Sequence, residues 1–115
     1  MEFREQSFAA ALEVASECDT AWVVHAWIPG GPGFVVHAWA EVDDAVYDLT
    51  ESNHPFPKAQ YYARMGVREE WLRRYDRLTF FTLVAEHGSL GPFDPALLPL
   101  TSPHAPLLAS PPASD

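Results

Sequence analysis

The chain has 115 residues, a formal net charge of −9 and a single cysteine, and 48% of its residues are hydrophobic. This length suits one domain with its own hydrophobic core, and one cysteine excludes both an internal disulfide framework and a cysteine-rich zinc module. Seven basic residues against sixteen acidic ones argue against a nucleic-acid partner, and no apolar run approaches the roughly 18–20 residues that a membrane span needs.

The N-terminal part of the chain predicts a helix and no targeting signal. The first five residues lack the basic start and apolar stretch of a secretory signal, so we expect a cytoplasmic location. Within residues 3–17, an apolar stripe recurs at helical spacing, formed by Phe8, Ala11, Leu12 and Ala15. We therefore expect this helix to pack its apolar stripe against the rest of the domain.

The next part of the chain predicts β-strands, near residues 21–28, 34–42 and 45–50. The sequence Val-Val-His-Ala-Trp occurs at 23–27 and again at 35–39, and the turn-rich segment between the two copies predicts a hairpin. If the loop is symmetric about Gly31, His25 lies directly opposite His37 on one face of the sheet. A slip of one residue puts the two histidines on opposite faces.

A second hairpin follows at Asp43-Asp44, which suits a two-residue loop. Such a loop pairs Val42 with Ala45 and makes His37 and Asp48 diagonal neighbours on one face, roughly 7–8 Å apart at the backbone. A carboxylate there accepts the imidazole N–H, selects one tautomer and makes the ring a stronger base. This pair is the most chemically specific arrangement in the sequence.

Two further helices are predicted in the C-terminal half. Residues 56–66 form a short helix that ends at Gly66, and residues 67–75 fit either a strand or a helical turn. Asp76 suits the N-cap of a last helix that ends at Gly88.

The composition changes after residue 94. Residues 95–115 contain six prolines and little charge, which predicts a flexible or loosely docked tail behind a single domain at 1–94. The predicted fold class is α+β: an N-terminal helix packed on a small antiparallel sheet of three or four strands, with two more helices.

The strand residues also carry a family resemblance. His37-Ala38-Trp39-Ala40-Glu41 and the later Asp48-Leu49-Thr50 resemble the His-x-Trp-x-Glu … Asp-x-Thr segment of small papain-like and transglutaminase-like thiol hydrolase domains. The chain is similar, over roughly residues 5–94, to small uncharacterised bacterial and phage proteins of that type, which share the later Tyr61-Tyr62, Arg74-Tyr75 and Gly88–Asp94 segments. The resemblance implies a fold in which a cysteine at the start of the first helix attacks an amide, while a histidine and an aspartate come from adjacent strands.

The resemblance carries three catalytic positions over to this chain. Ser7 stands at the nucleophile position in place of cysteine, His37 at the position of the general base and Asp48 at that of the group orienting it. The chain is then a serine variant, a degenerate non-catalytic relative, or a protein whose native nucleophile was replaced. Ser7 also suits an ordinary helix cap. Cys18 follows the helix beside two acids, which is unfavourable for a thiolate nucleophile and fits a structural thiol.

Four side chains are candidates for a binding groove beside this site: His25, Trp27, Trp39 and Glu41. Packing in the core explains the tryptophans and His25 as well, and solvation at a strand edge explains Glu41. If His25 faces His37, the two rings and Asp48 offer zinc ligands. Helical pairs such as His-x-x-x-His are absent, so the leading hypothesis includes no metal and no cofactor.

Two functions follow from these residues. The leading hypothesis is an amide hydrolase of the peptidase or amidase type, acting on a peptide or another amide-containing substrate. The alternative is a non-catalytic binding or regulatory protein on the same scaffold, with a protein partner. A Ser7 hydroxyl more than about 5 Å from His37, or a buried His37 without a cleft, favours the alternative. The sequence leaves the oligomeric state open.

Overall fold

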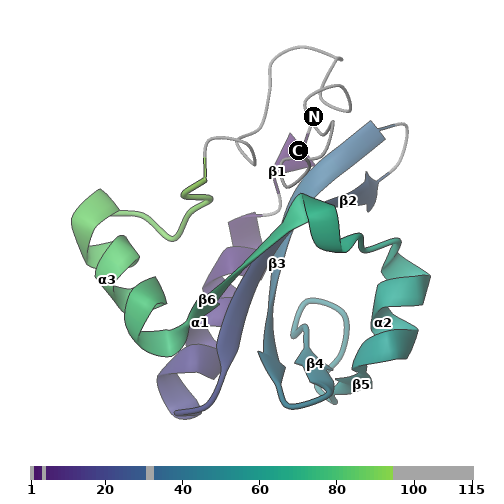
Figure 1. Cartoon of the computed structure of the whole chain (residues 1–115), viewed down its shortest axis with the longest axis horizontal. Helices are drawn as coiled ribbons and strands as arrows, with labels where there is room; N and C mark the ends of the chain where they lie inside the picture. Colours follow the sequence, from purple (N-terminus) through teal and green to yellow (C-terminus); the bar gives the residue numbers. More distant parts are fainter. Residues whose placement is uncertain (1, 4, 31–32, 95–115) are drawn as a thin grey trace.

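The computed structural model describes residues 2–3, 5–30 and 33–94 (Figure 1). The predicted tail at 95–115 lies outside the described residues. Five strands form the order β5-β4-β3-β2-β6, in which every neighbouring pair is antiparallel, and β1 joins the same sheet by pairing in parallel with β3.

The elements in chain order are β1 (Glu2–Phe3), α1 (Glu5–Glu17), β2 (Trp22–Gly30), β3 (Gly33–Val42), β4 (Ala45–Tyr47), β5 (Phe56–Pro57), α2 (Lys58–Met65), the 3₁₀ helix η1 (Glu69–Trp71), β6 (Leu72–Asp76) and α3 (Arg77–His87). The predicted α+β fold with an N-terminal helix on the sheet is confirmed. The sheet has more strands than predicted. Strands β1 and β5 were not predicted because each is only two residues long, which is too short to show an alternating pattern.

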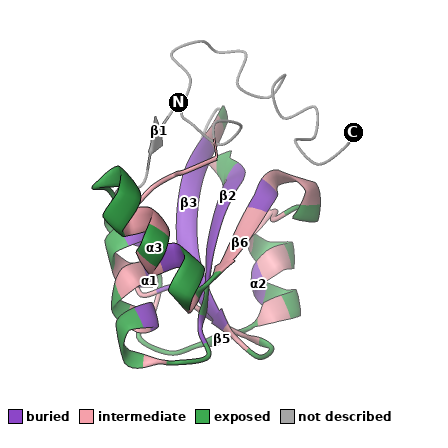
Figure 2. Ribbon diagram, turned by 60° about the vertical axis from the view of Figure 1, so that its left-hand side comes forward, coloured by how far each residue is buried: buried purple, intermediate pink, exposed green. Residues whose placement is uncertain are grey.

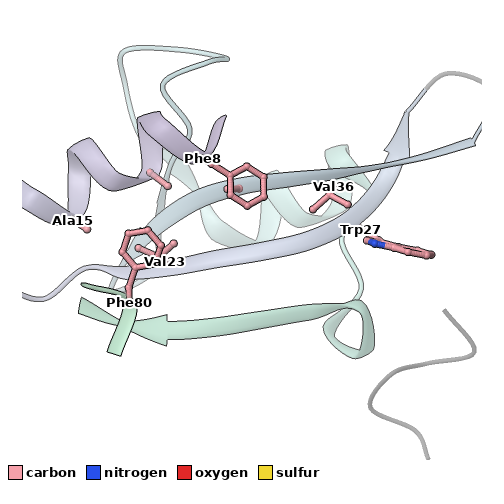
Figure 3. Close-up of a cluster of buried hydrophobic side chains, with 8 residues drawn as sticks. Phe8, Ala15, Val23, Trp27, Val36 and Phe80 are labelled. Carbon is pink, nitrogen blue, oxygen red and sulfur yellow. The ribbon is translucent and has the colours of Figure 1, made fainter. Parts of the chain in front are cut away.

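Helices cover both faces of the sheet: α1 and α3 lie on one face, the α1 face, and α2 lies on the other, the α2 face (Figures 1 and 2). The core under the α1 face consists of Phe8, Ala11, Ala15, Val23, Trp27, Val36, Ala38 and Phe80 (Figure 3). The core under the α2 face consists of Val24, Ala26, Ile28, Val35, Trp39, Val46, Tyr61 and Leu72. Successive strand residues point to opposite faces, so β2 and β3 contribute to both cores and are apolar almost throughout.

Local signals place the C-terminal ends of α2 and α3 as predicted, but the predicted start of α2 at residue 56 is wrong, because Phe56 and Pro57 pair with β4 as strand β5 and α2 begins at Lys58. Gly66 and Gly88 follow the two helices with φ of 70° and 67°, the left-handed conformation that glycine adopts most readily. At the other end of α3, Asp76 Oδ1 accepts the N–H of Thr79 at 2.8 Å. None of the helices within the described ranges is long and apolar enough to span a membrane.

The prediction that a helix begins at residue 3 is wrong by two residues. Phe3 belongs to β1, and α1 begins only at Glu5. The strand prediction for residues 45–50 is also too long, because β4 ends at Tyr47. The segment at 67–75 contains both predicted alternatives, a helical turn followed by a strand.

The register of β2 and β3 corrects the symmetric hairpin prediction. Gly30 pairs with Gly33, so two residues and not one lie between the paired strands. His25 is therefore opposite Ala38, and His37 is opposite Ala26. This is the one-residue slip, and it places the two histidines on opposite faces of the sheet. In contrast, the predicted pairing at the second hairpin, Val42 with Ala45, is confirmed.

Candidate functional site

The predicted contact between His37 and Asp48 is formed. His37 Nε2 lies 2.7 Å from Asp48 Oδ2, and both side chains are at most 1% exposed. Burial by itself raises the pKa of Asp48, but its hydrogen bonds and its charge interaction with His37 outweigh burial and hold that pKa below its usual value. The aspartate is therefore an anion at neutral pH, and the anion accepts the Nε2–H of the ring.

In the neutral form of the ring, donation from Nε2 leaves a lone pair on the second ring nitrogen of His37, Nδ1. Nδ1 is buried and has no hydrogen-bond partner among the described residues. Buried polar atoms without a partner are uncommon in folded proteins, and a catalytic role is one of the reasons for which they are retained. His37 therefore has one nitrogen fixed by a carboxylate and one nitrogen able to accept a proton.

Ser7 contacts the backbone of Ala38, the residue that follows His37 on β3. Its Oγ accepts the N–H of Ala38 at 3.0 Å. Along this edge of β3, β1 pairs with residues 35–36 and β4 pairs with residues 40–42, so the N–H of Ala38 lies in the gap between them. The first turn of α1 fills that gap, which explains how a helix that packs on the α1 face brings Ser7 to the backbone beside His37.

The site is closed to solvent in this structure. Ser7 is 1% exposed and His37 is 0% exposed. By the criterion set out from the sequence, a buried His37 favours the non-catalytic alternative. A cavity of about 310 Å³ lies instead beside the C-terminal half of α1, where it is lined by Glu13, Val14, Glu17, Cys18, Val42, Tyr47 and Leu49.

The predicted groove of His25, Trp27, Trp39 and Glu41 is not formed as one surface. His25 and Trp27 point to the α1 face, whereas Trp39 points to the α2 face with His37. The physical reason is the one-residue slip between β2 and β3, because the pleat alternates the faces. All four side chains are at most 4% exposed, so they are core residues in this structure.

His25 is enclosed by aromatic rings. Its centroid lies 4.5–6.0 Å from those of Phe8, Tyr75, Phe80 and Phe93, and neither of its nitrogens has a hydrogen-bond partner among the described residues. Burial lowers the pKa of His25 to about 3. Because His25 and His37 face opposite ways, the zinc arrangement considered from the sequence is not formed. The described part of the chain contains no group of three side chains suited to a metal ion.

Glu41 is the centre of a polar network on the α2 face rather than a solvated strand-edge residue. Its carboxylate accepts hydrogen bonds from Trp39 Nε1 at 3.0 Å, from Arg74 Nε at 3.1 Å and from the Tyr62 hydroxyl. Lys58 Nζ lies 3.5 Å away. These partners come from β3, β6 and α2, so Glu41 joins three elements and its paired charge is accommodated despite burial.

Cys18 directly follows α1, at the opposite end of this helix from Ser7. It is partly exposed, and its Sγ lies 3.6 Å from Thr20 Oγ1. The thiol therefore takes no part in the site at His37.

Two further contacts of Asp48 were not identified from the sequence. Thr50 and Tyr61 both donate hydrogen bonds to its carboxylate. The spacing of Asp48 and Thr50 is a signal for a local turn in which a side chain accepts a backbone N–H. Tyr61 belongs to α2, and no local pattern points to that contact.

Comparisons with protein-family models, with curated proteins and with solved structures found no match to this chain.

Proposed function

We propose that this chain is a papain-like or transglutaminase-like hydrolase domain that attacks amide bonds, with Ser7 as nucleophile, His37 as general base and Asp48 as the group that orients His37. The arrangement of His37 between Asp48 and the backbone contact of Ser7 supports this assignment. His37 is bound to a carboxylate through Nε2 only, its Nδ1 is free of partners among the described residues, and Ser7 Oγ lies at the adjacent peptide N–H.

The proposed reaction is an acyl transfer to serine followed by hydrolysis. Ser7 Oγ and His37 Nδ1 are not hydrogen-bonded in this structure, so the side chains must first move into reach of each other. Ser7 Oγ then forms a bond to the amide carbonyl carbon while its proton passes to His37 Nδ1. His37 then returns that proton to the leaving nitrogen as the C–N bond breaks, which releases the amine and leaves an ester on Ser7. Water hydrolyses the ester with His37 again acting as base, and Asp48 stabilises the imidazolium at both stages.

Two features favour charge on the Ser7 oxygen. The N–H of Ala38 donates to Oγ, and a donor stabilises an oxygen more strongly as its negative charge grows. Ser7 is also the third residue of the 13-residue helix α1, whose N-terminal end carries a partial positive charge. A serine hydroxyl is far less acidic than a thiol, so this site depends on such stabilisation more than a cysteine enzyme does.

The second candidate function is a non-catalytic binding or regulatory domain on the same scaffold. Burial of Ser7 and His37 favours it, because no substrate reaches these atoms until the covering side chains move aside. Ser7 also has a structural role that needs no catalysis. It satisfies a backbone N–H in the gap between β1 and β4, and such a group costs about 1–3 kcal/mol when it is buried without a partner.

A thiol at position 7 separates the two functions. The test uses the full chain with Ser7→Cys in a Cys18→Ala background, so that position 7 carries the sole thiol. Iodoacetamide labelling is followed by mass spectrometry at neutral pH, with circular dichroism as a check on folding. A thiolate held by His37 is expected to react at least about tenfold faster in the folded protein than in the same protein unfolded in urea.

The control variant adds His37→Gln, which keeps a polar side chain but removes the base. Hydrolase chemistry predicts that labelling of the folded protein falls to the unfolded rate or below. Labelling that is slower in the folded protein from the start, or that is equally fast with and without His37, overturns the catalytic proposal and favours the binding domain. In the unsubstituted chain, a fluorophosphonate probe is expected to label Ser7 and to leave the Ser7→Ala variant unlabelled.

A further inference from the structure

The carboxylate of Asp48 accepts four hydrogen bonds, two on each oxygen. Thr50 N and Thr50 Oγ1 lie 3.1 and 2.5 Å from Oδ1. The Tyr61 hydroxyl and His37 Nε2 lie 2.5 and 2.7 Å from Oδ2. Thr50 is only two residues from Asp48, so its contacts belong to the local turn. Tyr61 comes from α2, and it shares with His37 the single oxygen that the proposed mechanism uses.

The Tyr61 ring is held in place independently of this contact. It is 1% exposed and lies between Trp39 and Phe56, with ring centroids 5.2 and 5.4 Å away. Burial and the charge of Asp48 both raise the pKa of Tyr61 far above its usual value, so the hydroxyl stays protonated and remains a donor. The direction of the hydrogen bond is therefore fixed, from Tyr61 to Asp48.

We infer that Tyr61 is a positioning residue of the proposed hydrolase site: its hydroxyl fixes Asp48 Oδ2 and limits the negative charge that this oxygen presents to His37. The effect of Tyr61 on catalysis rests on the proposed function, whereas its effect on the hydrogen bond between His37 and Asp48 does not. The two donors compete for the same oxygen, so loss of the Tyr61 hydroxyl leaves Asp48 a stronger acceptor toward Nε2–H. His37 then holds a proton more tightly, and a neighbouring thiolate forms at lower pH.

The neighbouring tyrosine provides a matched control. Tyr62 follows Tyr61 on α2, also packs against Trp39, and also donates its hydroxyl to a buried carboxylate, that of Glu41. Tyr62 makes no contact with Asp48 in the described structure. Tyr61→Phe and Tyr62→Phe therefore remove the same chemical group from adjacent positions, and a purely structural role predicts similar effects for both.

The first measurement is the pH profile of iodoacetamide labelling in the Ser7→Cys, Cys18→Ala protein. Tyr61→Phe is expected to move the acidic midpoint of the profile down by about half a pH unit or more, whereas Tyr62→Phe leaves it in place. If labelling depends on His37 but the two tyrosine variants give the same profile, the inference is wrong although the proposed function stands.

The second measurement does not depend on catalysis. In the chain with native Ser7, the ¹H NMR signal of the His37 Nε2 proton is expected to move downfield in Tyr61→Phe, because the hydrogen bond to Asp48 strengthens when its competitor is removed. The signal is expected to stay unchanged in Tyr62→Phe. If position 7 shows no His37-dependent labelling, the hydrolase proposal fails, and this signal still decides whether Tyr61 controls the His37–Asp48 pair. An unchanged signal in Tyr61→Phe overturns the inference.

Discussion

Mild acid should weaken this fold through His25, because its ring is buried and neither nitrogen has a hydrogen-bond partner among the described residues. The rings of Phe8, Tyr75, Phe80 and Phe93 surround it. The polar groups around this aromatic enclosure do not favour a charged imidazole. Burial raises the pKa of Tyr75 to about 12, so it is neutral, and Arg73 on β6, opposite His25, is paired with Asp94. His87 at the end of α3 packs against the Phe93 ring, with ring centroids 5.1 Å apart.

The magnitude follows from the lowered pKa. His25 titrates near 6.5 in the unfolded chain and near 3 in the folded protein. As the pH falls below about 6.5, His25 binds a proton in the unfolded chain but stays neutral in the folded protein. The contribution of His25 to the free energy of unfolding is therefore complete above that pH and declines toward pH 3. At about 1.4 kcal/mol per pKa unit, His25 alone removes about 2 kcal/mol from the free energy of unfolding between pH 7 and pH 5.

The assay compares urea unfolding at pH 7 and pH 5, followed by tryptophan fluorescence, in the native chain and in His25→Leu. Leucine keeps the site apolar and cannot titrate, so its loss of stability between the two pH values should be smaller by about 2 kcal/mol. Carboxylates that begin to protonate near pH 5 affect both proteins equally and cancel in the comparison. His54→Leu is the control, because His54 is exposed and its removal should leave the pH dependence unchanged.

If His25→Leu loses as much stability as the native chain between pH 7 and pH 5, His25 is not the source of this pH dependence. A second observation uses the native chain alone and needs no variant. The NMR signal of the His25 Cε1 proton should not titrate between pH 8 and pH 5 while the protein remains folded. Titration of that signal with a midpoint near 6 shows that the ring is hydrated or paired.

Two further predictions concern the packing around this residue. Gly91→Ala should lower the free energy of unfolding by about 2 kcal/mol or more, because the new Cβ would lie 2.6 Å from His25 Cε1 at a φ of +113°; Gly33→Ala, where nothing lies within 4 Å, should be much milder in the same urea titration. Phe80→Ala should cost about 3–5 kcal/mol, because its side chain is fully buried on α3, whereas Leu78→Ala on the same helix, at 77% exposure, should stay within about 0.5 kcal/mol; a similar cost for both would contradict the core assignment.

Elements with strong local signals were predicted close to their true positions. The C-terminal ends of α2 and α3 follow from the backbone conformations of Gly66 and Gly88, and the start of α3 follows from Asp76, whose side chain accepts a backbone N–H three residues away. The Asp43-Asp44 turn likewise sets the pairing of β3 with β4. In each case the determining interaction spans only a few residues, so the sequence alone contains it.

The register of β2 with β3 could not be derived in the same way. The sheet is covered on both faces, so most residues of β2 and β3 are buried whichever face they point to. Apolar and polar residues therefore do not alternate along these strands, and the sequence does not show which residues share a face. The glycine-rich connection allows more than one turn geometry as well. The choice between a facing and an opposed pair of histidines therefore depended on how the strands pack between helices.

The same distinction applies to the candidate site. Pairing of His37 with Asp48 follows from a short hairpin, and the sequence predicted it. The positions of Ser7 and Tyr61 depend on long-range packing: α1 reaches a gap in the edge of β3, and α2 packs under Trp39.

Composition, turn residues and helix caps by themselves determined an acidic α+β domain in which a histidine on one strand lies near an aspartate at the end of the next. Only the tertiary structure decided that His25 lies in an aromatic enclosure away from His37, that Asp48 has a second donor in Tyr61, and that the hydroxyl of Ser7 bonds to the peptide next to His37. The physical reason is that each of these contacts joins segments whose closeness is set by the burial of whole faces, a property that no single stretch of the chain carries.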